Sequence, residues 1–177
     1  MKLAEEQIGS LRALLARPRR RSVTVAHASP DGDAVGSSLA WAEVLRGLGH
    51  EVTCIVPNKY PYFLDWMPGI GEVVVFKTDA EGRAAKAVAE ADAIFCLDFN
   101  AVSRLEILSA TIEANTTACR VLIDHHLQPD EGVDIVFSHP EASSTCFLVY
   151  CLVEALYGRE AVTRRMAELL YVGMMTD

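Results

Sequence analysis

The sequence lacks the residue spacings that mark several common ligand sites. No pair of its five cysteines has the C-x-x-C spacing of a zinc or redox site, and their number is odd, so we expect five small buried hydrophobic residues. It contains neither G-x-x-x-x-G-K-[ST] nor G-x-G-x-x-G, which gives no support to a nucleotide-binding P-loop or a Rossmann dinucleotide site. Any ligand must therefore be bound through other groups.

Long apolar runs and an excess of positive charge are also missing. No apolar stretch reaches the roughly 18 residues of a membrane span, and the N-terminus lacks the apolar run of a signal peptide, so we expect a cytoplasmic protein without a membrane partner. The formal net charge is -8, and an acidic surface repels a long duplex nucleic acid. A small anionic substrate is compatible with this charge if a metal-rich pocket outweighs it locally.

What the sequence does contain is an alternation of apolar strands with helices, typical of an α/β fold with one doubly wound, mainly parallel sheet of about five strands and helices on both faces. The 177 residues suffice for one domain, residues 1–177. A run of arginines (Arg17, Arg19, Arg20 and Arg21) follows the first helix and predicts a solvated surface, with a phosphate-binding arm as the alternative. The predicted strands are residues 22–27, 51–56, 71–76, 93–98, 120–124 and 133–137, and the predicted helices are residues 3–15, 34–48, 80–91, 102–115, 143–157 and 161–175.

Three of these strands end in carboxylate or imidazole side chains. The first runs into His27, with Asp31 and Asp33 beyond it; the strand of residues 93–98 ends in Asp98; and the strand of residues 120–124 runs into Asp124-His125-His126. Ligands of an open parallel sheet bind outside the carboxyl ends of its strands. We therefore expect the three segments to meet at one edge, although about 100 residues separate the first from the last.

Such a gathering of charges requires neutralisation, because burying each one unpaired costs several kcal/mol. Divalent cations would supply it, and oxygen and imidazole ligands without thiolates suit Mn, Mg or Co better than structural zinc. Two cations that share a carboxylate are a usual arrangement for phosphate-ester hydrolysis. The alternatives are a helix N-cap at Asp33, a turn at Asp31-Gly32, and a polar surface loop at Asp124-His125-His126; a calcium loop is disfavoured because Val35 stands where an oxygen ligand is required.

At this point a family resemblance can be read from the residues. The stretch from His27 to Ser37, Asp98 with Ser103-Arg104, Asp124-His125-His126 and Thr176-Asp177 resemble the four motifs of the DHH phosphoesterase superfamily. They look most like its bacterial branch that degrades very short RNA (nanoRNA) and dephosphorylates 3′-phosphoadenosine 5′-phosphate. The resemblance implies a hydrolase of phosphate esters in small nucleotides or short single-stranded RNA, using two divalent cations, Mn first and Mg or Co as alternatives.

The resemblance also implies a role for each motif position. Asp98 would bridge the two cations. Asp124 would orient a ligand imidazole from behind, His126 would touch the substrate phosphate or transfer a proton, and Arg104 would hold the phosphate or the metal loop. The implied metal ligands are His27 and Asp31 for one cation, Asp33, His125 and Asp177 for the other, and Asp98 for both.

The chain also departs from the family pattern. The family carries a C-terminal substrate-binding domain, whereas this chain stops at Asp177; we expect residues 1–177 alone to bind metal and turn over little substrate. Phe147 stands where the family often has a glutamate, and Ser143 and Thr145 are predicted to be helix caps rather than substrate ligands. The alternative functions are a non-catalytic nucleotide- or metal-binding module, a cyclic-dinucleotide phosphodiesterase, a single-strand exonuclease and a manganese pyrophosphatase. The sequence does not predict the oligomeric state.

Overall fold

The computed structural model describes residues 1–18 and 20–177, and its centre is one sheet of six parallel strands. Their order is β3-β2-β1-β4-β5-β6, so the predicted doubly wound α/β fold is confirmed with one strand more than expected. The central strands β1, β4 and β5 are apolar along most of their length because both of their faces are covered. The strands are β1 (Arg21–Ala26), β2 (Glu51–Val56), β3 (Val74–Val75), β4 (Ala93–Leu97), β5 (Cys119–Asp124) and β6 (Ile135–Ser138).

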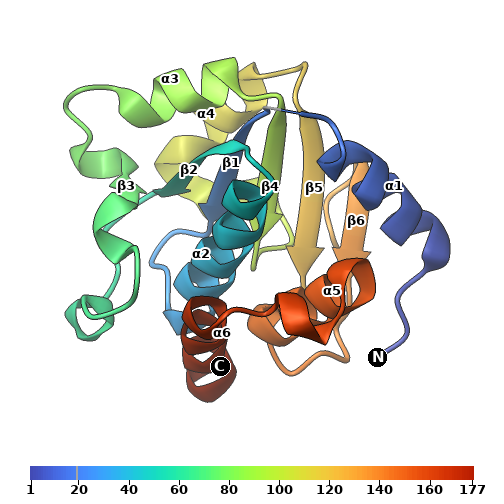
Figure 1. The fold of residues 1–177 in the computed structure, drawn as a ribbon. Coiled ribbons are helices and arrows are strands. Elements are labelled where there is room, and N and C mark those ends of the chain that lie inside the picture. The colour runs from blue at the N-terminus through green and yellow to red at the C-terminus, as the bar shows by residue number, and fades with distance from the viewer. Residues whose placement is uncertain (19) are drawn as a thin grey trace.

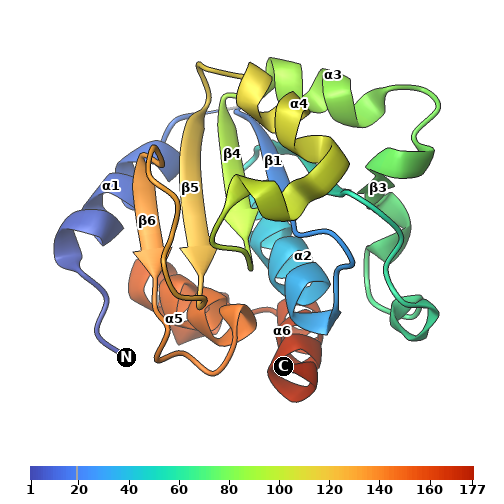
Figure 2. The same cartoon turned by 180° about the vertical axis from the view of Figure 1, so that it is seen from behind.

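Helices cover the two faces of the sheet unequally. Four helices (α1, α2, α5 and α6) lie on the face toward the viewer in Figure 1, and α3 and α4 lie on the face toward the viewer in Figure 2. The helices are α1 (Glu5–Leu15), α2 (Gly32–Gly47), α3 (Arg83–Glu90), α4 (Ser109–Ala114), α5 (Thr145–Tyr157) and α6 (Arg164–Thr176), with short 3-10 helices η1 (Tyr62–Leu64), η2 (Ile70–Glu72), η3 (Phe76–Thr78), η4 (Val102–Leu108) and η5 (Arg159–Ala161).

The hydrophobic core is divided by the sheet into two clusters. Successive strand residues alternate between them: Ile94 packs in the cluster under α3 and α4, whereas Phe95 packs in the larger cluster under α1, α2, α5 and α6. Trp41 of α2 is fully buried, and its ring centre lies 5.7 Å from that of Phe95. The packing fixes α2 on the sheet, with its first turn at the carboxyl end of β1.

Two local predictions were wrong in detail. The segment predicted as a strand over residues 71–76 pairs with β2 only at Val74 and Val75, because tight 3-10 turns surround that pair. The helix predicted over residues 102–115 is broken at Glu106, whose φ of +49° is not helical. The hydroxyl of Ser109 bridges the break by donating to the Val102 carbonyl at 2.8 Å. Apolar periodicity does not register a single left-handed residue or a two-residue edge strand.

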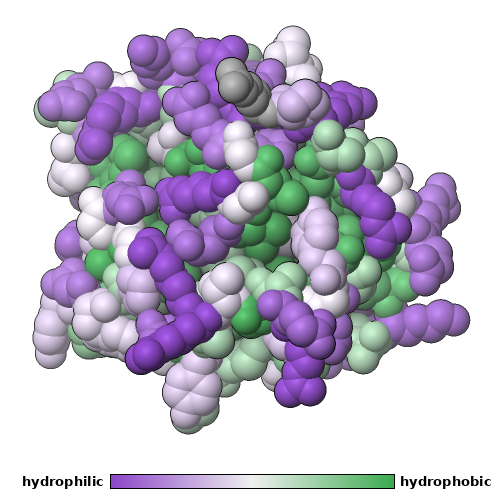
Figure 3. Space-filling model, in the orientation of Figure 1, coloured by the Kyte–Doolittle hydropathy of each residue, from purple (hydrophilic) through white to green (hydrophobic). Residues whose placement is uncertain are grey.

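The surface is mostly polar. Figure 3 shows hydrophobic residues gathered toward the middle of the four-helix face, crossed and bordered by hydrophilic ones. In the predicted arginine run, Arg21 pairs with Glu90 at 3.1 Å at the beginning of β1, and Arg19 lies outside the described residues. Within residues 1–18 and 20–177, no helix is both long and apolar enough to span a membrane.

Glycines bring α6 unusually close to α2. A Cβ atom on Gly36 would lie 2.7 Å from the Leu169 carbonyl oxygen and 3.0 Å from the Cys146 Sγ, and one on Gly32 would collide with the Thr176 hydroxyl. Only hydrogen side chains allow this approach. It places the end of α6, where Asp177 follows, beside the first turn of α2.

Replacing Gly36 by alanine should therefore destabilise the fold. We expect Gly36→Ala to lower the free energy of unfolding by about 1–3 kcal/mol, because backbone atoms of α6 must move to admit the methyl group. The matched control is Gly9→Ala in α1, where nothing lies within 4 Å and helix propensity predicts a gain of up to about 1 kcal/mol. Urea denaturation measures both, and equal stability of Gly36→Ala and the parent chain would contradict the close approach.

Candidate metal centre

The site lies at the point in the sheet where successive strands change from one side of β1 to the other. From β1 the strands proceed to β2 and β3, and the chain then returns to β4, which pairs with β1 on its other side. A crevice forms at the carboxyl ends of strands at such a switch point. His27 follows β1, Asp98 follows β4 and Asp124 ends neighbouring β5. The three predicted segments thus meet at one edge.

Six side chains at this edge form two groups with metal-ligand spacing. Within each group, one potential ligand atom per residue lies within 4.8 Å of the others. A third group of the same kind joins Asp98, His125 and His126. The first two groups coincide with the ligand sets that the family resemblance implies: they are His27, Asp31 and Asp98, and Asp33, His125 and Asp177.

Asp98 stands between the two groups. Its Oδ2 lies 3.5 Å from His27 Nε2, and its Oδ1 lies 3.5 Å from His125 Nε2, so the two oxygens face different groups, as in a bridging carboxylate. The backbone of Asp98 is in the left-handed region, with φ of +65°, which few residues other than glycine adopt without cost. Its N–H still donates to the Ile123 carbonyl at 3.1 Å, which fixes the residue to the end of β5.

Asp33 is held by the beginning of α5. Its Oδ2 accepts the N–H of Thr145 at 2.7 Å, and its Oδ1 accepts the N–H of Cys146 at 2.8 Å. The N-cap of α2 is Asp31, whose Oδ1 accepts two backbone N–H groups of the first turn. The alternative reading of Asp33 as a helix cap is therefore wrong. Its fully buried carboxylate is aimed into the site by a helix N-terminus, whose dipole stabilises negative charge.

The two histidines present the same ring nitrogen to the site. The Nδ1 of His27 lies 2.8 Å from the Ala28 carbonyl, and that of His125 lies 3.3 Å from the Ala142 carbonyl. A carbonyl only accepts, so each Nδ1 carries a hydrogen and each Nε2 is left to bind a cation.

The surroundings of His125 test whether a metal fits. Its buried Nε2 has no hydrogen-bond partner among the described residues, yet carboxylate oxygens of Asp33, Asp98 and Asp177 lie 3.5 to 3.8 Å away. These separations exceed those of direct hydrogen bonds. A cation between the imidazole and the carboxylates satisfies all four groups, and the oxygen and nitrogen donors suit Mn or Mg.

The electrostatics of the carboxylates agree with this fit. Burial raises the pKa of Asp33, although the N–H of Cys146 opposes the shift. Burial also raises the pKa of Asp98, where the neighbouring His27 imidazole opposes the shift and the charge of Asp33 adds to it. Asp177 has a raised pKa as well, from burial and from neighbouring carboxylates. Ionisation of all three is costly without a positive charge among them, which a divalent cation would supply.

Asp124 orients His126 rather than His125. Its Oδ1 lies 2.7 Å from His126 Nδ1, and Asp124 is fully buried. The resemblance implied that Asp124 would orient a ligand imidazole, and the structure gives it the other histidine of the pair. The His126 side chain is 41% exposed, so its ring is held from behind and open to solvent in front.

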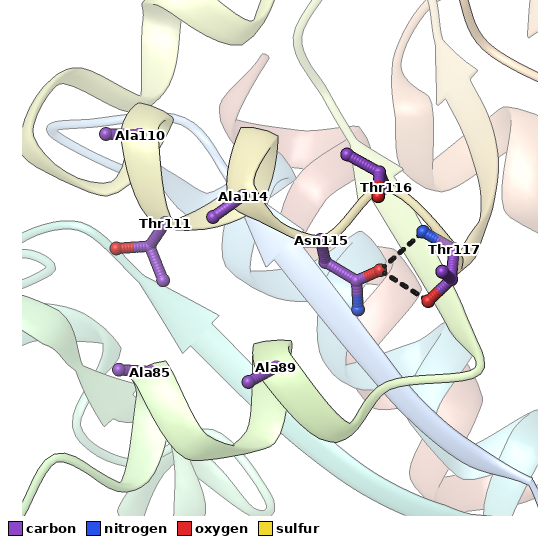
Figure 4. A pocket seen from close by; sticks show the side chains of 8 residues that line it. All are labelled: Ala85, Ala89, Ala110, Thr111, Ala114, Asn115, Thr116 and Thr117. Carbon is purple, nitrogen blue, oxygen red and sulfur yellow. Dashed lines mark hydrogen bonds between the residues drawn. The ribbon is translucent and has the colours of Figure 1, made fainter.

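A separate groove between α3 and α4 does not belong to this site. Figure 4 shows its lining of small side chains and Asn115, whose Oδ1 accepts from the backbone and hydroxyl of Thr117. The Asn115 amide donates to the carbonyls of Val88 and Ala91. Asn115 thus joins the end of α3 to the turn before β5, at the strand ends opposite the metal centre, which is a structural role.

Comparison with known proteins identifies the family. The model of the DHH family, N-terminal domain, matches residues 22–174. The chain belongs to the DHH family. The match covers most of the chain and contains every site residue described above except Asp177.

Solved structures agree with this DHH assignment. An exopolyphosphatase-related protein from Bacteroides fragilis is 39% identical, with a TM-score of 0.91 over 97% of this chain and 50% of that one. The exonuclease RecJ bound to manganese is 18% identical, with a TM-score of 0.55 over 98% and 43% of the two chains. RecJ from Thermus thermophilus in complex with Mn²⁺ is 16% identical, with a TM-score of 0.54 over 95% and 24%. The RecJ structures show the fold alone, and this DHH chain spans about half the length of the Bacteroides protein.

Among the predicted site residues of this DHH domain, Arg104 contacts the neighbourhood of the cluster through its backbone and not through its side chain. Its side chain is exposed and makes no hydrogen bond or ion pair within the described part of the chain. Its carbonyl accepts the N–H of Ala28 at 2.8 Å. Arg104 therefore contacts the loop after β1 through its backbone, a contact that does not depend on its side chain.

Thr145 contributes to the site in a way that the sequence analysis missed. The cap of α5 is Ser144, whose hydroxyl accepts the N–H of Phe147 at 3.0 Å, so the predictions for Ser143 and Thr145 as caps were wrong. The Thr145 hydroxyl instead donates to Asp98 Oδ1 at 2.8 Å. Any of the three adjacent hydroxyl residues 143–145 could cap α5 by chemistry alone, and the packing of α5 against α2 and β5 determines which one does.

Thr145 should thus act as a positioning residue for Asp98. We expect Thr145→Val to weaken Mn²⁺ binding about 10-fold or more, because the Asp98 carboxylate loses its hydroxyl donor while side-chain volume is conserved. Thr145→Ser keeps the donor and should bind Mn²⁺ as the parent does. Isothermal titration calorimetry compares the three chains, and equal affinities for valine and serine would show that the hydroxyl has no such role.

Proposed function

We propose that this DHH domain hydrolyses phosphate esters of small nucleotides or very short single-stranded RNA, in the cytoplasm, with two divalent cations. The observation that carries the proposal is the position of Asp98, with one carboxylate oxygen facing His27 and the other facing His125. Mn is the expected metal, with Mg and Co as alternatives; the two RecJ structures of the same fold contain manganese. Nanoribonuclease and 3′-phosphoadenosine 5′-phosphate phosphatase are the specific activities proposed.

The candidate ligands would form two groups, one for each cation. His27, Asp31 and Asp98 would hold one cation, and Asp33, His125 and Asp177 would hold the other together with Asp98. Bound divalent cations supply a nucleophile from water at neutral pH and stabilise charge on phosphoryl oxygens. The protein would supply fixed ligands, since Asp33 and Asp98 are buried and held by α5.

His126 would handle a proton or a phosphate oxygen. Asp124 accepts the hydrogen on His126 Nδ1, which leaves Nε2 directed to the substrate. A protonated Nε2 could donate to a phosphate oxygen or to a leaving alkoxide. This role requires the half-exposed position that His126 has.

Charge favours a small substrate. The net charge of -8 opposes attraction of a long phosphate backbone, and Arg21, the last arginine of the run, lies at the opposite end of β1 from the site, where it pairs with Glu90. A non-catalytic binding module is disfavoured because every implied metal ligand is present and falls into one of the two groups.

Cyclic dinucleotides, single-stranded DNA, pyrophosphate and polyphosphate belong in a hydrolysis screen beside dinucleotides and 3′-phosphoadenosine 5′-phosphate.

The metal content is a first test. We expect calorimetric titration of the chain with MnCl₂ to show two sites, because two ligand groups share Asp98. His125→Ala should remove one site and leave that of His27 and Asp31 occupied. A single site in the parent chain would refute the two-metal arrangement.

The bridging role of Asp98 predicts a large effect on turnover. In the protein that carries this domain, Asp98→Asn should reduce the rate of dinucleotide hydrolysis with Mn²⁺ by at least about 100-fold, because both cations lose a charged ligand. Glu90→Gln is the control, since Glu90 forms a surface pair with Arg21 at the far end of the sheet. Retention of a tenth of the parent rate by Asp98→Asn would contradict the bridging role.

A further inference from the structure

The loop that follows β2 presents three aromatic side chains to solvent. Tyr62 is 83% exposed, Phe63 54% and Trp66 64%. Trp41 and Phe95, by contrast, are fully buried, whereas Tyr171 on α6 is 64% exposed. The ring centres of Tyr62 and Phe63 lie 6.2 Å apart, and large exposed apolar patches are uncommon on soluble proteins and mark binding surfaces. We call Tyr62, Phe63 and Trp66 the aromatic platform.

The platform is held rigidly from below. Tyr60, Leu64 and Met67 of the same loop are buried in the larger core cluster. Successive tight turns close the backbone between them: Leu64 N–H donates to the Pro61 carbonyl at 3.0 Å, and Met67 N–H donates to the Leu64 carbonyl at 2.9 Å. The exposed aromatic residues are thus fixed outward and lose little conformational freedom when they bind a ligand.

The same loop is attached to the metal centre. Asn58 accepts the N–H of Ser29 at 2.6 Å, and Ser29 lies between the candidate ligands His27 and Asp31. Figures 1 and 2 show the loop and the end of α6 at the same edge of the molecule, where the strands end. Tyr62 follows Asn58 by four positions, which is at most about 14 Å of chain. A nucleoside attached to a phosphate at the metal centre extends over a distance of this order.

We propose that the aromatic platform stacks a nucleobase of the substrate whose phosphate is held at the metal centre; this rests on the proposed function. An acidic chain gains no general attraction for a nucleotide, so affinity beyond the metal contacts must come from its uncharged part. Stacking on aromatic side chains supplies it with little regard to base identity. The rings of Tyr62 and Phe63 meet edge to face at 78°, an arrangement that leaves ring faces free for stacking.

Tryptophan fluorescence gives a binding assay independent of turnover. Trp41 is fully buried, so Trp66 is the tryptophan within reach of a ligand. Adenosine 5′-monophosphate and the dinucleotide pApA should quench its emission, whereas ribose 5-phosphate, which has the phosphate but no base, should not. Equal quenching by all three compounds, or by none, would overturn the platform.

Variants separate the platform from the fold. In the protein that carries this domain, Tyr62→Ala should weaken pApA binding and raise its KM about 10-fold with little change in kcat, because one stacking surface is lost. Tyr157→Ala, at the end of α5 away from the site, should leave both values unchanged. Thermal denaturation verifies that each variant is folded. An unchanged KM in the double variant Tyr62→Ala/Trp66→Ala overturns the proposal.

The outcomes distinguish this proposal from the proposed function. Hydrolysis of pApA with an unchanged KM in the double variant rejects the platform and keeps the hydrolase. Base-dependent quenching of Trp66 without hydrolysis of any phosphate ester keeps the platform and rejects the hydrolase. If sedimentation shows that the parent self-associates, that the double variant is monomeric and that nucleotide affinity is the same in both, the aromatic residues serve a second copy of this chain and the proposal is overturned.

Discussion

The structure depends on the crowding of carboxylates around the unpaired Nε2 of His125. Asp33, Asp98 and Asp177 come from three parts of the chain and each has a raised pKa. These carboxylates can all be ionised at low cost only if a positive charge lies among them. The backbone near the cluster is strained to bring them together. Asp98 adopts a left-handed conformation at the end of β4, and the N-terminus of α5 is occupied by Asp33. These features have a common explanation in a cation held at the edge of the sheet.

Both the sheet and the helices that cover it position the residues of the candidate metal centre. The sheet brings His27, Asp98 and His125 together because β1, β4 and β5 are neighbours. The helical layer adds what the strands lack: α5 fixes two carboxylates through Thr145 and Cys146, and α6 carries Asp177. The helical layer requires close approach, which explains why Gly36 and Gly173 lie at the contact; a Cβ on Gly173 would lie 2.6 Å from Asp33 Oδ1. Packing of α2 against α6 is therefore also packing of the metal ligands.

Features that follow from residue type and from the order of strands along the chain could be predicted from the sequence. Apolar strands that end in carboxylates and imidazoles indicated both the doubly wound sheet and the convergence of the ligands. The sequence could not predict contacts that depend on tertiary placement. Ser143, Ser144 and Thr145 are chemically similar, and the position of α5 alone makes Ser144 the cap and Thr145 the partner of Asp98. The pairing of Asp124 with His126 was hidden for the same reason, since either histidine satisfies the motif.

The acidity of the chain and the chemistry of its site are consistent because they act over different distances. At physiological ionic strength, charges farther apart than about 8 Å are largely screened, so the net charge governs which large polyanions approach. Within the proposed centre, buried ligands and the cations they would hold act at contact distance on a phosphate. Under the proposed function such a protein would discriminate by size, because a small nucleotide would meet the centre directly, whereas a long strand would also meet the acidic surface. The uncharged aromatic platform at the same edge would strengthen binding of the small ligand without weakening this exclusion.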